Sequence, residues 1–226
     1  LLSAVAETKP LEAWDINVNG LFNVLKVARI HHCAVFFPSS IAAFGPETPS
    51  FDTPQDTIQR PKSLYGITKV AGELLCDYYH HHYGIDTRGL RYPGLISNKA
   101  LLGGGTTDYA VDIFYAAVKN RHYECFLRPD TQLDMMYMPD AVTAAIALME
   151  ADSTRLQHRN AFNVTAMSFT PTQLAAEIQK HLPDITISYT IDPRVQGQVT
   201  IRTSGRIAGR DLFSIFYQIL RANGIA

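Results

Sequence analysis

Several features that define common protein classes are scarce or absent in this sequence of 226 residues. It contains only three cysteines, Cys33, Cys76 and Cys125, with no C-x-x-C pair. This argues against a disulfide framework or a thiolate zinc site, so we expect buried free thiols in a reducing compartment. No apolar run approaches the roughly 20 residues of a membrane-spanning helix. The formal net charge of −1 offers no attraction to nucleic acid or to an anionic membrane.

A convergent set of metal ligands is also missing. His80, His81 and His82 are adjacent, but successive residues of a helix point about 100° apart, so three neighbouring imidazoles cannot meet at one ion. Histidines in the last turn of a helix are favoured by its dipole. We therefore predict no metal site.

What the sequence does contain is typical of a folded α/β protein, with 46% hydrophobic and 18% charged residues. Apolar spacing predicts helices over residues 11–28 and 63–83. A continuous apolar run at 33–38 predicts a strand buried on both faces, and residues 86–92 predict the next strand. A strand, loop, helix and strand in this order indicate a parallel sheet, in which the loops at the carboxyl ends of the strands carry the chemistry.

Beyond about residue 95 the pattern becomes less regular and predicts a mixed α/β lobe. The final thirty residues have no clear core periodicity before Leu212. We expect three regions, namely residues 1–97, 98–194 and a divergent tail over 195–226. The elements expected after residue 95 are helices at 108–120, 139–151 and 171–181 and strands at 123–127, 135–138 and 161–164.

Tyr65 and Lys69 form a Tyr-x-x-x-Lys pair near the start of the helix over 63–83. Residues four apart share one helical face, so the ammonium is expected to lower the pKa of the phenol and make it a usable general acid or base. Ser39 and Ser40 directly follow the first buried strand. A serine hydroxyl there can bind the same substrate oxygen as Tyr65.

The segment Pro38-Ser39-Ser40-Ile41-Ala42-Ala43-Phe44-Gly45, followed by Tyr65 and Lys69, resembles the extended short-chain dehydrogenase/reductase family of NAD-dependent epimerases and dehydratases. Further matches to that family lie at residues 17–23, 91–95 and 134–141. The resemblance implies an α/β fold, a Rossmann-like doubly wound parallel sheet with a smaller mixed α/β substrate lobe. The first βαβ units of the family are absent from these residues.

The resemblance also implies roles for individual residues. The family tyrosine is the catalytic acid/base, the lysine also binds the nicotinamide ribose of NAD, and a serine orients the substrate oxygen. Leu1–Ala4 is similar to the end of the family's fourth strand, which touches the cofactor. The implied catalytic residues are Tyr65, Lys69 and Ser40; the implied NAD contacts are Ser3, Tyr65, Lys69 and Leu95; the implied substrate contacts are Ser39, Ser40, Tyr65, Gly105 and Thr107.

Within the family, residues 92–97, 103–110 and 133–138 are similar to the short-chain type of L-threonine 3-dehydrogenase. That similarity implies oxidation of L-threonine by NAD to 2-amino-3-oxobutanoate. Glycines let backbone N–H groups approach a carboxylate, so Gly105 and the Thr107 hydroxyl are expected to hold the amino acid.

Two departures from the family pattern affect this interpretation. The G-x-G-x-x-G that seats the pyrophosphate has no counterpart here, and the sequence diverges from the family after residue 194. We therefore expect the chain by itself to be inactive. Two alternatives stay open: a nucleotide-sugar epimerase or dehydratase that uses the same three residues, and an inactive remnant that binds or oligomerises with a complete subunit.

Partner and compartment follow from the resemblance alone. The helices over 11–28 and 63–83 form the dimer interface in relatives, so we expect a homodimer with L-threonine as its small-molecule ligand. Animal and protist relatives are mitochondrial and bacterial ones cytoplasmic.

Overall fold

A computed structural model of the chain describes residues 1–99, 103–156 and 158–190, and its fold is mixed α/β and Rossmann-like. These residues form two compact units, which we describe separately. Unit 1 consists of residues 1–49, 53–93 and 139–164, and unit 2 of residues 50–52, 94–138 and those from 165 onward. The tail expected over 195–226 lies outside the described residues.

The sheet of unit 1 is parallel, as the sequence predicts. Its order is β1 (Val35–Ser40), β2 (Thr87–Tyr92) and β6 (Phe162–Asn163). β1 and β2 run in register from Val35 opposite Thr87 to Ser40 opposite Tyr92, so their carboxyl ends lie side by side. β1 starts two residues later than expected because His32 ends the preceding helix in the left-handed conformation, with φ of 52°.

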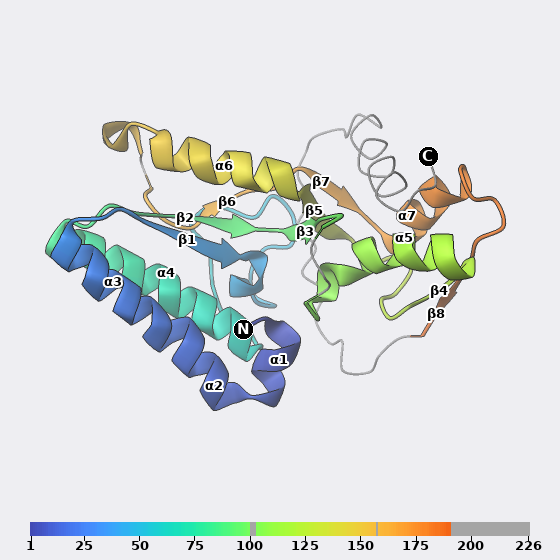
Figure 1. Cartoon of the computed structure of the whole chain (residues 1–226), viewed down its shortest axis with the longest axis horizontal. Coiled ribbons are helices and arrows are strands. Elements are labelled where there is room, and N and C mark those ends of the chain that lie inside the picture. The colour runs from blue at the N-terminus through green and yellow to red at the C-terminus, as the bar shows by residue number, and fades with distance from the viewer. Residues whose placement is uncertain (100–102, 157, 191–226) are drawn as a thin grey trace. The chain divides into compact units, whose positions relative to one another are not determined.

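Helices cover both faces of this sheet (Figure 1). α3 (Gly20–His31) and α4 (Leu64–Tyr83) lie on one face, and α6 (Met138–Glu150) lies on the other. The first two pack on the strands through apolar side chains, which gives the doubly wound arrangement expected from the sequence. The buried cluster consists of Leu25, Ala28, Val35, Phe37, Cys76, Tyr79 and Ile85.

The amino-terminal part of unit 1 differs from expectation in two ways. The helix expected over 11–28 is divided into α2 (Pro10–Trp14), a π-helical turn η1 (Asp15–Asn19) and α3. The expected strand end at Leu1–Ala4 is wrong, because Ser3 begins the helix α1 (Ser3–Thr8). The Asn17 side chain binds Leu1, at 2.6 Å from its nitrogen and 3.1 Å from its oxygen.

Residues 139–164, which we expected in the lobe, belong to unit 1. β6 joins the sheet because Leu90 and Arg91 pair with Phe162 and Asn163. A short turn, η4 (Ser153–Arg155), follows α6. The chain therefore leaves unit 1 after β2 and returns to it with α6.

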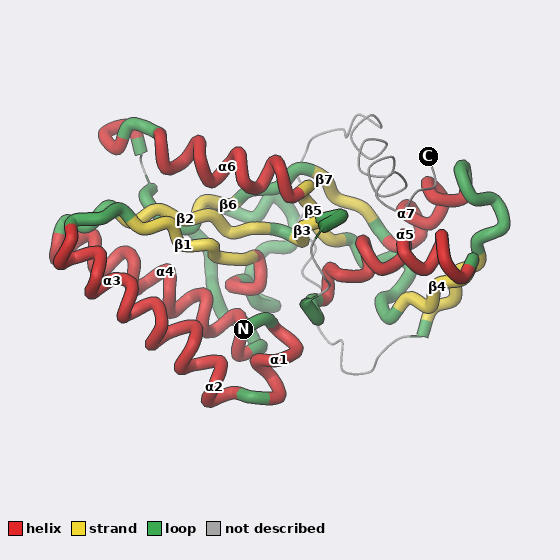
Figure 2. Tube along the Cα trace, in the orientation of Figure 1, coloured by secondary structure: helices red, strands yellow, loops and turns green. Residues whose placement is uncertain are grey.

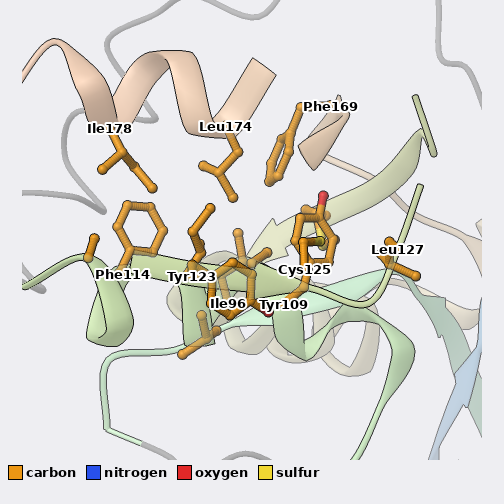
Figure 3. Close-up of a cluster of buried hydrophobic side chains, with 14 of the residues drawn as sticks. Ile96, Tyr109, Phe114, Tyr123, Cys125, Leu127, Phe169, Leu174 and Ile178 are labelled. Carbon is orange, nitrogen blue, oxygen red and sulfur yellow. The ribbon is translucent and has the colours of Figure 1, made fainter. Parts of the chain in front are cut away.

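Unit 2 contains a three-stranded sheet in the order β3-β5-β7, with β3 and β5 parallel and β7 antiparallel. A second pair, β4 and β8, is parallel. Figure 2 distinguishes these strands from the helices beside them, and Figure 3 shows the apolar core that they share. The elements are β3 (Gly94–Ile96), α5 (Tyr109–Asn120), β4 (His122–Cys125), β5 (Leu133–Tyr137), β7 (Met167–Phe169), α7 (Pro171–Gln179) and β8 (Thr186–Tyr189).

The three cysteines are free, as the sequence predicts. Cys76 and Cys125 are buried as expected, but the expectation is wrong for Cys33, which is exposed just before β1. Within the described residues, no helix combines the length and the apolar character that a membrane crossing requires.

Candidate active site

The first turn of α4 fixes the position of Tyr65. The Ser63 hydroxyl caps the helix by accepting a hydrogen bond from the Gly66 amide at 3.1 Å. Glu7 of α1 accepts a second bond from the Leu64 amide at 2.7 Å. Both amide groups belong to the unpaired donors of a helix N-terminus, so these bonds hold the turn that carries Tyr65.

Lys69 lies one turn further along the same face of α4. Its ammonium nitrogen is 5.4 Å from the centre of the Tyr65 ring and 5.2 Å from that of Phe37. It donates a hydrogen bond of 2.6 Å to the Pro38 carbonyl oxygen of β1. The helix and the carboxyl-terminal half of the strand are thus joined directly at the site.

Gly72 allows α4 to lie this close to β1. A Cβ atom at this position would be 2.3 Å from the Phe37 ring, and Phe37 is buried in the core of unit 1. A side chain at position 72 would overlap this ring, so that either the ring or the helix would have to move.

Burial dominates the ionisation of both groups. It raises the pKa of Tyr65, and the hydrogen-bonding Ser40 side chain offsets this in part. Burial also lowers the pKa of Lys69 to about 8, which the negative charge of Glu73 partly opposes. Our expectation that Lys69 would bring the pKa of Tyr65 below its usual value is therefore wrong for this structure, because desolvation of the phenolate is the larger effect.

The two serines at the end of β1 point to opposite sides, as successive residues of a strand do. Ser40 is half-buried, accepts a hydrogen bond from the Ala42 amide at 3.2 Å and begins the short helical turn η2 (Ile41–Ala43). Its side chain is the one that interacts with Tyr65. The structure therefore brings Ser40, Tyr65 and Lys69 together.

Ser39 does not join that group. Only 3% of its surface is exposed, and its hydroxyl donates a short hydrogen bond to the Glu73 carboxylate. The expectation that Ser39 contacts substrate is wrong for this structure, because the strand turns its side chain inward against α4.

A buried ion pair next to these residues was not predicted from the sequence. Arg91, at the end of β2, makes a bidentate pair with Glu73 of α4, with N–O distances of 3.0 and 2.9 Å. Gln59 donates a further bond of 2.8 Å to the same carboxylate. Glu73 lies four residues after Lys69, so helical spacing could have placed it on the same face as Tyr65 and Lys69.

The other predicted residues lie outside this cluster. Ser3 is half-buried at the start of α1. In unit 2, Leu95 is in β3 and Thr107 in the turn η3 (Thr106–Asp108), which packs against Gly94. The Gly105 amide, expected to face a substrate carboxylate, donates instead to the Asp108 side chain at 2.9 Å, because that carboxylate caps the turn.

The sequence model of the NAD dependent epimerase/dehydratase family matches residues 3–165. Another model, of GspD-like N0 domains, matches residues 185–226, of which only 185–190 are described here. A curated relative from Staphylococcus haemolyticus, an epimerase/dehydratase of uncharacterised function, is 56% identical over 193 residues. Those residues are 85% of this chain and 61% of the relative.

Two solved structures of L-threonine dehydrogenases are similar over nearly the whole chain. The Clostridium difficile enzyme is 49% identical, with a TM-score of 0.90. The match covers 100% of this chain and 75% of that enzyme's chain. The Phytophthora infestans enzyme is 42% identical, with a TM-score of 0.91. The match covers 99% of this chain and 77% of that enzyme's chain.

The fold and the Tyr-x-x-x-Lys site define a short-chain dehydrogenase/reductase-type α/β protein. The chain belongs to the NAD-dependent epimerase/dehydratase family. Its structural neighbours include L-threonine dehydrogenases, and it spans about 61% of the curated relative's length.

Proposed function

We propose that the protein that carries this chain oxidises the C3 hydroxyl of L-threonine to the ketone of 2-amino-3-oxobutanoate. The observation that carries the proposal is the grouping of Ser40, Tyr65 and Lys69 at the carboxyl end of β1. The similarity to threonine dehydrogenases at 49% and 42% identity supports the choice of substrate over others in the family.

In the proposed reaction, Tyr65 as phenolate takes the proton from the threonine hydroxyl, and Ser40 orients the hydroxyl oxygen. NAD, when bound, supplies the acceptor for the hydride that leaves C3. Because burial raises the pKa of Tyr65, we expect the oxidation rate to increase with pH in the alkaline range, where more of the phenol loses its proton.

The donors at this site suit the nicotinamide ribose of NAD. An ammonium group has three N–H donors, and Lys69 directs one of them to the Pro38 carbonyl oxygen. The remaining donors can bind ribose hydroxyls beside Tyr65. The residues proposed to hold this half of NAD are Ser3, Tyr65, Lys69 and Leu95.

Substrate recognition is proposed to use the Thr107 hydroxyl as a donor to the carboxylate of the amino acid. Thr107 is half-buried and packs against Gly94. The Gly105 amide could contribute only after it releases Asp108, so we assign the larger contribution to Thr107.

The test requires a chimera, in which the part of the Clostridium difficile enzyme that precedes the matched region is fused before Leu1. We expect this chimera to reduce NAD when threonine is added. Tyr65→Phe should lower kcat by about 100-fold or more, the lower range for loss of a positioned acid/base. Tyr83→Phe, at the far end of the same helix, is the control and should retain activity. A Tyr65→Phe chimera with more than a tenth of the original kcat would exclude Tyr65 from the reaction.

An epimerase or dehydratase is the second candidate, because the family and the curated relatives carry that description, and we propose a nucleotide sugar as its substrate. It uses the same three residues. Incubation of the chimera with UDP-sugars and with threonine separates the two: turnover of a sugar without turnover of threonine would favour this candidate.

We propose a homodimer formed through α3 and α4. Ile67, Leu74 and Tyr78 lie along one face of α4 and are 43%, 62% and 45% exposed. On α3, Val27 and Ile30 are 55% and 69% exposed. Apolar side chains gathered on two neighbouring helices indicate a protein interface.

The compartment stays a proposal. The curated relatives come from Staphylococcus, and bacterial relatives support the cytoplasm rather than the mitochondrion.

A further inference from the structure

The buried pair of Glu73 and Arg91 connects three elements of the site. Glu73 is 3% exposed and Arg91 6% exposed. Glu73 comes from α4, Arg91 from the end of β2, and Ser39, which donates to Glu73, from the end of β1. A single carboxylate therefore ties the helix of Tyr65 and Lys69 to the ends of both strands.

Neighbouring residues provide hydrogen-bond partners for almost all the polar atoms of Glu73 and Arg91. Gln59 donates to Glu73 at 2.8 Å, and Asn160 donates to its backbone oxygen at 2.8 Å. Arg91 donates further bonds to the Gln55 carbonyl oxygen at 3.0 Å and the Asn163 side chain at 3.1 Å. The charged groups near the carboxylate are Arg91 from β2 and, from its own helix, Lys69 and Asp77.

An ion pair in such a place contributes little net stability, because the loss of hydration offsets most of the attraction between the charges. What it does provide is a defined geometry, since a bidentate arginine–carboxylate pair fixes both distance and orientation. Here the fixed atoms lie next to the reacting groups. Ser39 lies between Pro38 and Ser40. The Pro38 carbonyl oxygen accepts a hydrogen bond from Lys69, and the Ser40 side chain interacts with Tyr65.

We propose that Glu73 is a positioning residue of this site: through Ser39 and Arg91 it sets the ends of β1 and β2 against α4, and it places a negative charge one helical turn from Lys69. The second part rests on the four-residue spacing of Lys69 and Glu73 along one face of α4, and the effect of the Glu73 charge on the Lys69 pKa agrees with it. The proposal depends on the assignment of the site to Tyr65, Lys69 and Ser40, but not on the identity of the substrate.

The first experiment measures the pKa of Lys69 without any turnover. Lysines of the 226-residue chain are labelled with ¹³C-methyl groups, and the Lys69 signal is identified by its absence in Lys69→Arg. Glu73→Gln should lower the pKa of Lys69 by about half a unit or more. Asp77→Asn, one turn further along α4, is the control and should leave it unchanged. An unaltered Lys69 pKa in a folded Glu73→Gln chain would overturn the proposal.

The second experiment uses the chimera and the Ser39→Ala variant, which keeps the ion pair and removes only its link to β1. We expect kcat to fall about tenfold while KM for threonine changes less, and the pKa of Lys69 to fall as its contact with Pro38 loosens. If Glu73→Gln does not fold, Ser39→Ala decides: wild-type kcat together with a wild-type Lys69 pKa would refute the proposal. A chimera that shows the Lys69 shift but oxidises no threonine would refute the proposed function alone.

Discussion

Asp134 of β5 is a carboxyl group with only 2% of its surface exposed. Burial raises its pKa from 3.8 to about 6, and the hydroxyls of Ser168 and Thr165 counter this only in part. The folded chain therefore holds a proton on Asp134 at pH values where the unfolded chain has lost it. The consequence is a stability that depends on pH.

Because the folded state binds more protons between pH 4 and 6, the free energy of unfolding should fall as the pH rises through this range. A shift of this size corresponds to about 2 kcal/mol between pH 4 and pH 7. Urea unfolding of the 226-residue chain at both pH values measures it. Asp134→Asn should remove most of the dependence, whereas Asp184→Asn, at an exposed ion pair, should retain it. Equal pH slopes in the wild type and Asp134→Asn would contradict this explanation.

Gly72 offers a second test at the scale of one residue. Gly72→Ala should destabilise unit 1 by about 1–3 kcal/mol, because the new methyl group overlaps the Phe37 ring and the helix preference of alanine recovers only part of this cost. Thermal unfolding measures the loss. Adding Phe37→Leu makes room for the methyl group, so the double variant should be more stable than the sum of the two single changes. Strict additivity would show that the contact is not the cause.

At the scale of elements, Arg88 of β2 fastens the end of α6 to the sheet. It is 4% exposed and donates to the carbonyl oxygens of Leu148 and Ala151 at 2.6 and 2.7 Å. It also pairs with Asp86 at 2.8 Å. The guanidinium thus satisfies carbonyl groups that a helix end leaves without partners.

Arg88→Met should lower the free energy of unfolding by about 2–3 kcal/mol, since hydrogen bonds from a buried charged group are lost. Hydrogen exchange should accelerate first in the last turn of α6. Arg128→Met is the matched control, because Arg128 and Asp130 form an exposed pair of the kind that contributes about 0–1 kcal/mol. Similar losses in both variants would argue against the fastening role.

The elements that the sequence predicts well are those with a strong local pattern. The apolar run before Ser39, the long helix that ends at Gly84 and the capping box at Thr170 are all confirmed. The π-helical turn η1 was missed because the apolar spacing over 11–28 predicts one continuous helix. The start of α1 was missed because the family resemblance assigned Leu1–Ala4 to the end of a strand, whereas Ser3 begins the helix.

Within the candidate site, the motif located Ser40, Tyr65 and Lys69, but not the groups that support them. Glu73 and Arg91 meet only because β2 pairs with β1 beneath α4, a contact between distant parts of the chain. The directions of the pKa shifts of Tyr65 and Lys69 could not be predicted either, because they depend on burial. A pair four residues apart predicts attraction but not the loss of hydration that outweighs it.

At the scale of the whole molecule, the exposed apolar face of α3 and α4 predicts self-association. Leu74→Glu should shift the 226-residue chain from dimer to monomer in analytical ultracentrifugation, because a charge in the contact would have to be desolvated. Val142→Glu is the control, since Val142 of α6 is also 50% exposed but lies on the other face of the sheet. A wild-type chain that sediments as a monomer at micromolar concentration would exclude this interface.

The return of the chain to unit 1 with α6 and β6 also affects its biosynthesis. The ribosome must produce residues 94–138 of unit 2 before residues 139–164 can complete unit 1. At about 5–20 residues per second, the nascent chain passes through an interval of seconds in which β2 lacks β6 and one face of the sheet lacks α6. During that interval the unpaired edge of β2 can pair with a wrong segment, and we expect chaperones to bind there.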